Sequence, residues 1–166
     1  MPLTDFDSLP DDARLWVFGA SAPIDEVDSP KLLTAVDLFL AEWKAHGHPL
    51  TSARTWHDER FLVIAVDQRT EGASGCSIDG LFRLLQGLEK AVGASMVGGG
   101  QVFFRDKVGL VHSLSRAEFE SLAKVGEVGT DTMVFDTSVV TLGAFRAGFE
   151  KPVRDSWQAQ LLPAAH

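Results

Sequence analysis

The run Arg60–Val66, RFLVIAV, constrains the fold more than any other stretch of this chain. Six consecutive residues, Phe61–Val66, are apolar, and β-branched and aromatic types dominate among them. A strand without polar alternation is buried on both faces or nearly so. Other segments of the chain must therefore cover both sides of this strand.

Patterns on either side of this strand predict the remaining elements. Ser29-Pro30 marks a helix start, and apolar residues follow at helical spacing until Gly47. A second amphipathic helix begins near Ile78 and closes near Gly93. The further predicted elements are strands at 14–20 and 50–57, a hairpin of 101–106 and 108–113 around Lys107, a helix after the capping box Ser115–Glu118, a strand at 132–136, a short helix near 142–150 and a C-terminal tail.

The order β-α-β-β-α-β predicts an α+β fold. It is the split βαβ pattern of a ferredoxin-like sandwich, here with an additional strand, a short helix and a C-terminal extension. A chain of 166 residues without a linker or repeat is expected to form a single domain over 1–166.

Composition limits the compartment and the partners. Fifteen Lys and Arg against 23 Asp and Glu give a net charge of −8, which argues against nucleic acid and anionic membranes. The single cysteine cannot form an internal disulfide, and the longest apolar run is far too short to span a bilayer. We therefore expect a cytoplasmic protein, without a membrane segment and without a cofactor.

Several short motifs along the chain resemble one known family. The most specific is Ser74–Asp79, SGCSID; weaker ones are RLWV at 14–17, WKAHG at 43–47, and Ser156-Trp157. On these motifs the chain resembles a family of small bacterial proteins that are often labelled "ABC transporter ATPase". The resemblance runs nearly from end to end, but it implies no established activity.

The residues themselves argue against nucleotide hydrolysis. A P-loop needs the pattern G-x-x-x-x-G-K-[ST], in which backbone N–H groups and a lysine hold the phosphates. None of the six lysines follows a glycine. Gly98-Gly99-Gly100 leads into a strand, so it cannot present a helix N-terminus to a phosphate. We expect the protein not to be an ATPase.

The loop-helix junction at 72–80 is the candidate site. Cys76 lies where the second helix is expected to begin, with Ser77 or Asp79 as its cap. Unpaired N–H groups and the helix dipole stabilise a thiolate at such a position, which makes Cys76 a candidate nucleophile. The alternative is that Cys76 is a small buried packing residue, since free cysteines are often buried.

Four further residues are candidates for ligand binding at this junction: Gly75, Ser77, Asp79 and Asp67. Asp67 could orient a ligand, or simply hold the loop by accepting backbone N–H bonds. None of the histidines, which are His46, His48, His57, His112 and His166, is placed by the predicted topology to act as a base for Cys76. His46 and His48 are expected at a helix end, and His112 is expected to be exposed. No spacing of cysteine and histidine predicts a metal site.

Two functions from different classes remain open. The first is a thiol-bearing pocket at 72–80 for an anion or small anionic metabolite. The second is a non-catalytic interaction domain that acts through homodimerisation or a protein partner, because open sheet surfaces invite pairing. The sequence does not decide whether the protein is an enzyme.

Overall fold

The computed structural model describes residues 4–164. They form two compact units, each built from two stretches of chain. The first unit contains residues up to Val97 together with Thr137–Ala147, and the second contains Gly98–Asp136 and the chain from Gly148 onward. The single domain predicted over 1–166 spans both units.

A three-stranded antiparallel sheet is the centre of the first unit. Its order is β1-β5-β4, formed by Arg14–Gly19, Phe61–Asp67 and Thr51–His57. In the register, Gly19 and His57 both lie opposite Phe61, at the two sides of the central strand. Every residue of β5 is buried, which confirms the prediction that this apolar run is covered on both faces.

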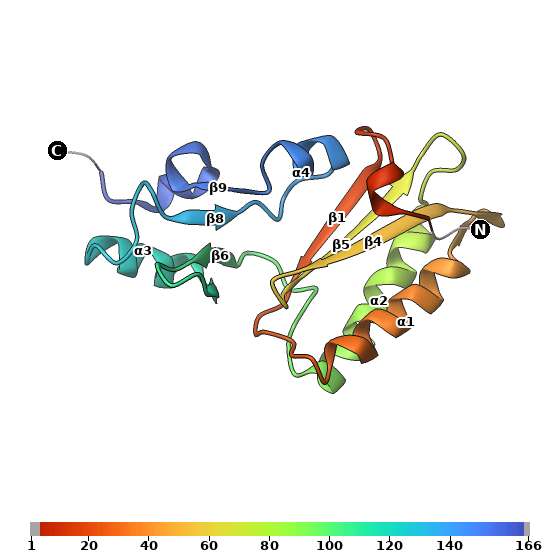
Figure 1. Ribbon diagram of the computed structural model, residues 1–166, viewed down its shortest axis with the longest axis horizontal. Coiled ribbons are helices and arrows are strands. Elements are labelled where there is room, and N and C mark those ends of the chain that lie inside the picture. The colour runs from red at the N-terminus through yellow and green to blue at the C-terminus, as the bar shows by residue number, and fades with distance from the viewer. Residues whose placement is uncertain (1–3, 165–166) are drawn as a thin grey trace. The chain divides into compact units, whose positions relative to one another are not determined.

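Two long helices cover one face of this sheet, side by side, as Figure 1 shows. They are α1, Ser29–Ala41, and α2, Gly75–Val92. The helix faces predicted from their spacing are buried, with Leu32, Val36 and Leu40 on α1 and Leu81 and Leu85 on α2. These side chains meet alternate residues of β5, namely Leu62, Ile64 and Val66.

The opposite face of the sheet is covered by shorter segments. Val63 and Ala65 of β5 pack there with Leu15, Ala53 and Leu142. Leu142 begins α4, Leu142–Gly148, and its backbone N–H donates to the carbonyl of Ala13 at 3.0 Å. Phe6 of η1, Phe6–Ser8, packs against the same cluster. Both faces of this sheet are therefore covered by other segments of the first unit.

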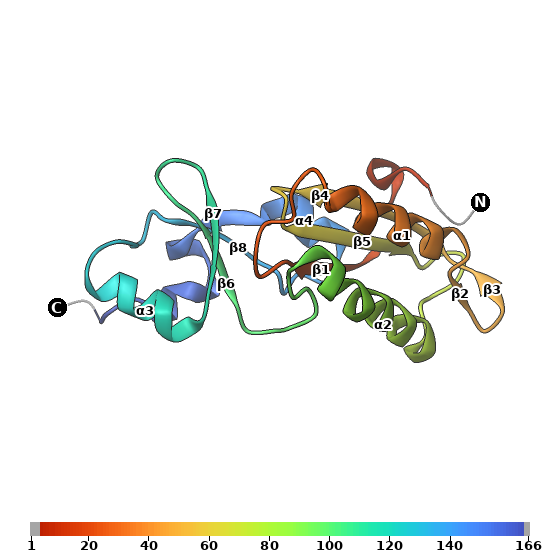
Figure 2. The same ribbon diagram turned by 90° about the horizontal axis from the view of Figure 1, so that it is seen from below.

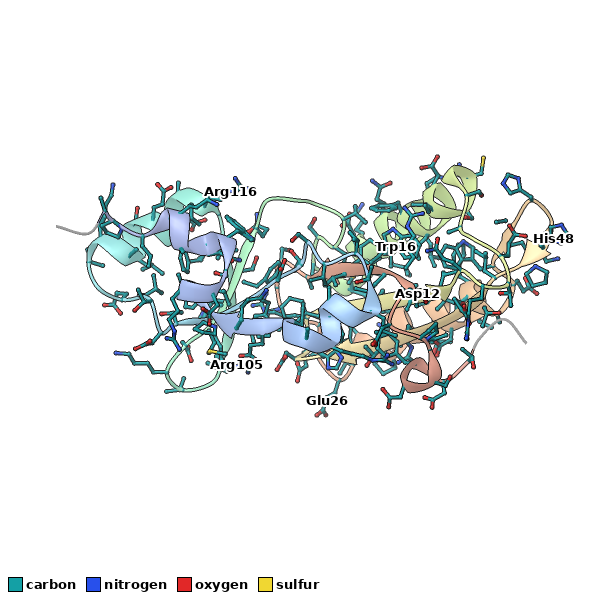
Figure 3. The ribbon with its side chains drawn as sticks, turned by 90° about the horizontal axis from the view of Figure 1, so that it is seen from above. Asp12, Trp16, Glu26, His48, Arg105 and Arg116 are labelled. Carbon is teal, nitrogen blue, oxygen red and sulfur yellow. The ribbon has the colours of Figure 1, made fainter. Side chains whose placement is uncertain are left out.

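The first helix ends earlier than predicted. α1 stops at Ala41, and a small hairpin of β2, Lys44–Ala45, and β3, His48–Pro49, follows it. His46 and Gly47 form its turn, both with positive φ, at 53° and 78°. Figure 3 labels His48 on this hairpin. The expectation that His46 and His48 lie at a helix end is therefore wrong, because the apolar pattern continues through Trp43 although the helix does not.

The second unit has a sheet of its own. Its order is β7-β6-β8-β9, formed by Val111–Leu114, Val102–Arg105, Met133–Phe135 and Glu150–Pro152. Helix α3, Arg116–Lys124, begins at the predicted capping box of Ser115 and Glu118. Figure 2 shows β6 and β7 as a hairpin leading into α3. The remaining segments are the short 3₁₀ helices η2, Val153–Asp155, and η3, Trp157–Leu161.

The C-terminal segment packs onto the core of this second unit. Trp157 contacts a cluster that contains Phe104, Phe119 and Val134. The guanidinium of Arg116, labelled in Figure 3, lies 4.8 Å from the centre of the Trp157 ring. Trp157 thereby holds the C-terminal segment against the core of this unit.

The α+β class is confirmed, with antiparallel sheets and four α-helices among the described residues. The ferredoxin-like topology is not confirmed. A sandwich of that kind needs a fourth strand beside β1, whereas β6 pairs with β7 and β8 in the second sheet. Strand β9, in the C-terminal extension, was not predicted.

No helix within residues 4–164 is long and apolar enough to cross a membrane.

Candidate functional site

The predicted site lies at the first turn of α2, whose cap differs from the expected one. Ser74 is the N-cap, and its hydroxyl oxygen accepts a hydrogen bond from the backbone N–H of Ser77 at 3.2 Å. The Ser77 hydroxyl accepts from the backbone N–H of Ser74 at 2.7 Å, which completes a capping box. The prediction that Ser77 or Asp79 is the N-cap is wrong, because Ser74 holds that position. Ser77 is the third helical residue, where a capping box more often has glutamate.

Cys76 is exposed at the second position of the helix. The alternative that it is a buried packing residue is therefore wrong. Gly75 and Asp79 are also exposed. Because Ser77 takes the capping bond, Gly75 and Cys76 hold the first-turn N–H groups without an intrahelical acceptor.

Ser77 is held from three directions. Its hydroxyl donates to the carbonyl of Ser74 at 2.8 Å while it accepts from the N–H of the same residue. The indole Nε1–H of buried Trp43 donates to the Ser77 carbonyl at 2.8 Å. These bonds fix the start of α2 and leave the Ser77 side chain engaged within the helix terminus.

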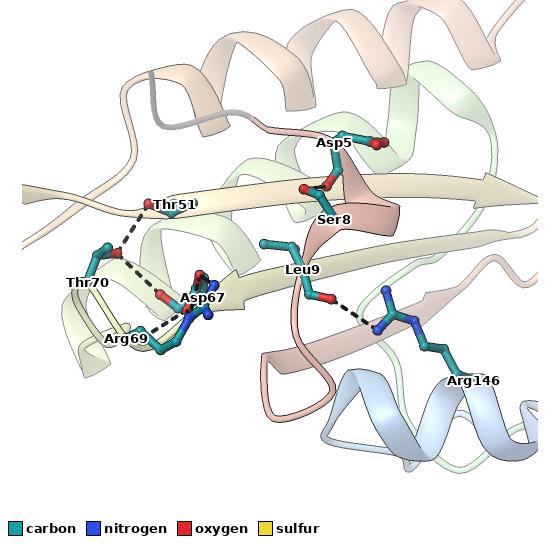
Figure 4. Close-up of polar contacts among 8 residues, drawn as sticks. All are labelled: Asp5, Ser8, Leu9, Thr51, Asp67, Arg69, Thr70 and Arg146. Atoms are coloured by element: carbon teal, nitrogen blue, oxygen red, sulfur yellow. Dashed lines mark hydrogen bonds and ion pairs between the residues drawn. The ribbon is translucent and has the colours of Figure 1, made fainter.

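Asp67 closes the loop that precedes the helix, as Figure 4 shows. It is buried at the end of β5, and its carboxylate accepts from Nε and Nη2 of Arg69 and from the Arg69 backbone N–H. The hydrogen bonds from the Arg69 side chain hold the pKa of the Asp67 carboxyl below its usual range. Thr70 joins this turn to Thr51 on β4 through their hydroxyls, 3.2 Å apart. Of the two roles expected for Asp67, the contacts are those of a residue that holds the loop by accepting a backbone N–H bond.

The structure brings Gly75, Cys76, Ser77 and Asp79 together on the first turns of one helix. It does not place a histidine in contact with them among the described contacts. His57 instead lies with its ring 5.9 Å from that of Phe145 on the opposite face of the sheet. His166 lies outside the described residues.

A pocket of about 890 Å³ lies in the second unit. It is bounded by the β6–β7 hairpin and by the chain that leads from the end of α3 to β8. Its apolar lining consists of Phe104, Val108, Leu122, Val125, Val128 and Met133. None of the predicted site residues lines it.

The side chains of His112 and Asp106 form a short hydrogen bond in the wall of this pocket. Nε2 of His112 lies 2.7 Å from Oδ2 of Asp106, and the imidazole stacks on the ring of Phe104, with centres 5.1 Å apart. The other carboxylate oxygen, Oδ1, accepts from the backbone N–H groups of Val108 and Leu110, each at 2.9 Å. The His112 side chain is 43% exposed, so it is neither fully buried nor as open as the sequence suggested.

These contacts keep Asp106 ionised. The hydrogen bond from His112, with help from the two backbone N–H groups, holds the pKa of the Asp106 carboxyl below its usual range. A carboxylate in this state accepts hydrogen bonds and cannot donate them. The pair therefore has the form in which a carboxylate orients an imidazole.

The other charged residues of the lining leave the pocket near neutrality. Arg105, labelled in Figure 3, donates to both carboxylate oxygens of Glu150, at 2.7 and 3.2 Å. Asp131 also lines the pocket and forms an ion pair with Arg154. Lys107 and Glu127 line the pocket with opposite charges. The pocket lining therefore has no large excess of positive or negative charge that would favour a strongly charged ligand.

The sequence contained a signal for this pair that the predicted hairpin missed. Asp106 begins the turn and Gly109 adopts a φ of 94° within it, a combination typical of an Asp-led turn. With the turn at 106–110, Phe104 lies directly opposite His112. A turn centred on Lys107 alone does not produce this pairing.

No group of three or more His, Cys, Asp or Glu side chains in the described part of the chain could hold a metal ion. Comparisons of the chain with protein-family models, with curated proteins and with solved structures found no match.

Proposed function

We propose that the second unit binds a small, uncharged and largely apolar molecule in the pocket beside His112. Its volume of about 890 Å³ is in the range of small-molecule sites, roughly 300–1,000 Å³. Apolar atoms contribute most of the surface that lines the pocket, as is usual for small-molecule sites, although seven of its thirteen lining residues are polar or charged.

One observation carries this proposal: an ordered carboxylate–imidazole pair stands beside an apolar floor. His112 is fixed by Asp106 at its edge and by Phe104 under its face. Val108 and Val125 at the pocket are 80% and 72% exposed, so the apolar lining continues to the protein surface. Exposed apolar side chains that adjoin a pocket are a common mark of ligand entry.

Binding of 4-ethylphenol, followed by backbone amide NMR, tests the proposal. The expected result is saturable shift changes at Phe104, His112 and Val128. Met133→Trp narrows the pocket and should weaken binding at least severalfold, whereas Leu38→Trp, at an exposed position on α1, should leave it unchanged. Amide spectra of both variants report whether the fold is kept. Absence of saturable shifts at the pocket, up to the solubility limit, with 4-ethylphenol and with the two related probes described below would overturn the proposal.

A second candidate function is anion or metabolite chemistry at 72–80 with Cys76 as the nucleophile. The observation that favours it is the exposed thiol beside the two uncapped N–H groups of Gly75 and Cys76. Asp79 would then border the ligand, and Asp67 would hold the loop. This proposal involves no ATP hydrolysis, since the loop 68–74 contains no lysine.

A further inference from the structure

The geometry of the Asp106–His112 pair determines which ring nitrogen carries the proton. Oδ1 of Asp106 is occupied by the N–H groups of Val108 and Leu110, and Oδ2 meets Nε2 of His112 at 2.7 Å. An ionised carboxylate can only accept. Nε2 must therefore be the protonated nitrogen, in the neutral imidazole as well as in the imidazolium.

It follows that Nδ1 of the neutral ring is an acceptor. Among residues 4–164, no hydrogen bond to Nδ1 of His112 is formed. One face of the ring is covered by Phe104, and the Nε2 edge is covered by Asp106. Nδ1 is thus the polar atom of this side chain that remains for a ligand in the pocket.

We infer that the pocket selects, through Nδ1 of His112, apolar ligands that carry one hydrogen-bond donor, such as a hydroxyl group. This inference rests on the proposed function and names the ligand class for the same pocket. The residues around the pair support an uncharged ligand, because Lys107 and Glu127 carry opposite charges. The two other charged lining residues are paired, Arg105 with Glu150 and Asp131 with Arg154. A ligand that covers Nδ1 without offering a donor removes the hydrogen bond that this acceptor makes to water, which disfavours such a ligand.

Two probes of nearly equal size measure this selectivity. 4-Ethylphenol carries a hydroxyl group where 4-ethyltoluene carries a methyl group. The measurement is made at about pH 8, where imidazoles are ordinarily neutral. The preference for the phenol over the toluene, expressed as the ratio of their affinities, should be about threefold to tenfold larger in the wild type than in His112→Phe. Phenylalanine keeps a flat ring on Phe104 and removes Nδ1, so it is the matched control.

Asp106→Asn should reverse the hydrogen-bonding character of Nδ1. The Val108 and Leu110 N–H groups need an acceptor, so they hold the amide oxygen and turn the amide NH₂ toward His112. Nε2 then becomes the acceptor and Nδ1 carries the proton, the change of tautomer known for an Asp-to-Asn substitution beside histidine. 4-Methylacetophenone, which only accepts, should gain affinity relative to 4-ethyltoluene in this variant.

Nitrogen-15 NMR of the imidazole reads the tautomer without any ligand. The wild type should show protonated Nε2, and Asp106→Asn protonated Nδ1. Failure of all three probes to bind the wild type overturns the proposed function itself. Binding with the same phenol-to-toluene ratio in wild type and His112→Phe overturns only the selectivity inferred here. If Asp106→Asn disrupts the turn, the inferred selectivity is tested by the comparison with His112→Phe and by the tautomer of the wild type.

Discussion

The indole of Trp43 donates a hydrogen bond of 2.8 Å to the carbonyl oxygen of Ser77. The two residues are 34 positions apart, so this bond joins the chain just beyond α1 to the first turn of α2. Trp43 is itself held between Trp16, with ring centres 6.0 Å apart, and Phe39, at 5.7 Å. The position of the Cys76 turn therefore depends on a buried tryptophan outside the motif.

Trp43→Phe should loosen the start of α2. The variant loses the indole hydrogen bond and leaves space in a buried site, which together cost about 2 kcal/mol. Hydrogen exchange of the α2 amides measures the effect. Trp157→Phe, in the second unit, should leave those amides unchanged. Equal protection of α2 in wild type and Trp43→Phe would show that the bond contributes nothing.

Two glycines should respond oppositely to alanine. Gly87 is exposed in the interior of α2 and has open space around an added Cβ, so Gly87→Ala should stabilise the protein by about 1 kcal/mol. An added Cβ at Gly143 would lie 3.1 Å from the backbone oxygen of Asp11, so Gly143→Ala should destabilise the protein. Urea denaturation of the two variants measures both effects, and a shift of both in the same direction would contradict the difference in packing between the two positions.

The turn between β4 and β5 holds two residues other than glycine at positive φ. Asp58 and Glu59 both have φ of 56°, the region of a type I′ turn that favours glycine. An L-residue there costs about 1–2 kcal/mol, part of which is offset by the greater freedom of glycine in the unfolded chain. Glu59→Gly should therefore raise the free energy of unfolding by about 0.5–1 kcal/mol in thermal or urea unfolding. Lower stability would mean that the Glu59 side chain makes an offsetting contact.

The Asp67–Arg69 pair should give stability that depends on pH. Arg69 lowers the pKa of Asp67 in the folded protein, so the pair stabilises the fold above the unfolded pKa of about 3.9. This contribution is lost as the pH falls through the lower folded pKa. Arg69→Gln should consequently destabilise the protein near neutral pH, and the difference from wild type should shrink in acid. Urea unfolding across that range is the measurement, and a difference that does not change with pH would contradict it.

Cys76 should be alkylated in the folded protein at a rate close to that of the unfolded chain or faster, because its thiol is exposed. Iodoacetate is an anion and iodoacetamide is neutral. If the N–H groups of Gly75 and Cys76 attract anions, the ratio of the alkylation rate with iodoacetate to that with iodoacetamide should be higher in the folded protein than in the unfolded chain. Mass spectrometry follows both reactions, and Cys76→Ser should abolish labelling. An unchanged ratio of the two reagents would remove the anion-site proposal while leaving Cys76 a reactive thiol.

Local sequence patterns predicted those elements that one short stretch of residues is enough to indicate. The apolar run of β5, the capping box of Ser115 and Glu118, and the αL glycine at 93, with φ of 70°, all appear as expected. The small hairpin at 44–49 was missed because the apolar periodicity of α1 extends to Trp43. The hairpin pairing of β6 with β7 was predicted, but the pairing of β6 with β8 was not, since strand pairing over long sequence separations depends on the whole chain.

The same division holds for the sites. The position of Cys76 at a helix start was predicted from its glycine- and serine-rich loop. The N-cap itself was not predicted, because both Ser74 and Ser77 carry a hydroxyl that could serve as the cap. The Asp106–His112 pair was missed because its register depends on the turn type. Moving a turn by one residue changes which side chains lie opposite each other.

The interleaving of the two units affects the order of events during translation. A ribosome that has released residues 1–97 has delivered β1, β4, β5 and both long helices, but not Leu142 or Phe145. The sheet face that carries Leu15, Val63 and Ala65 is completed only when the chain beyond 136 has been made. Nascent chains therefore display an apolar surface for the whole time that 98–136 is synthesised, and they are natural clients for chaperones at the ribosomal exit.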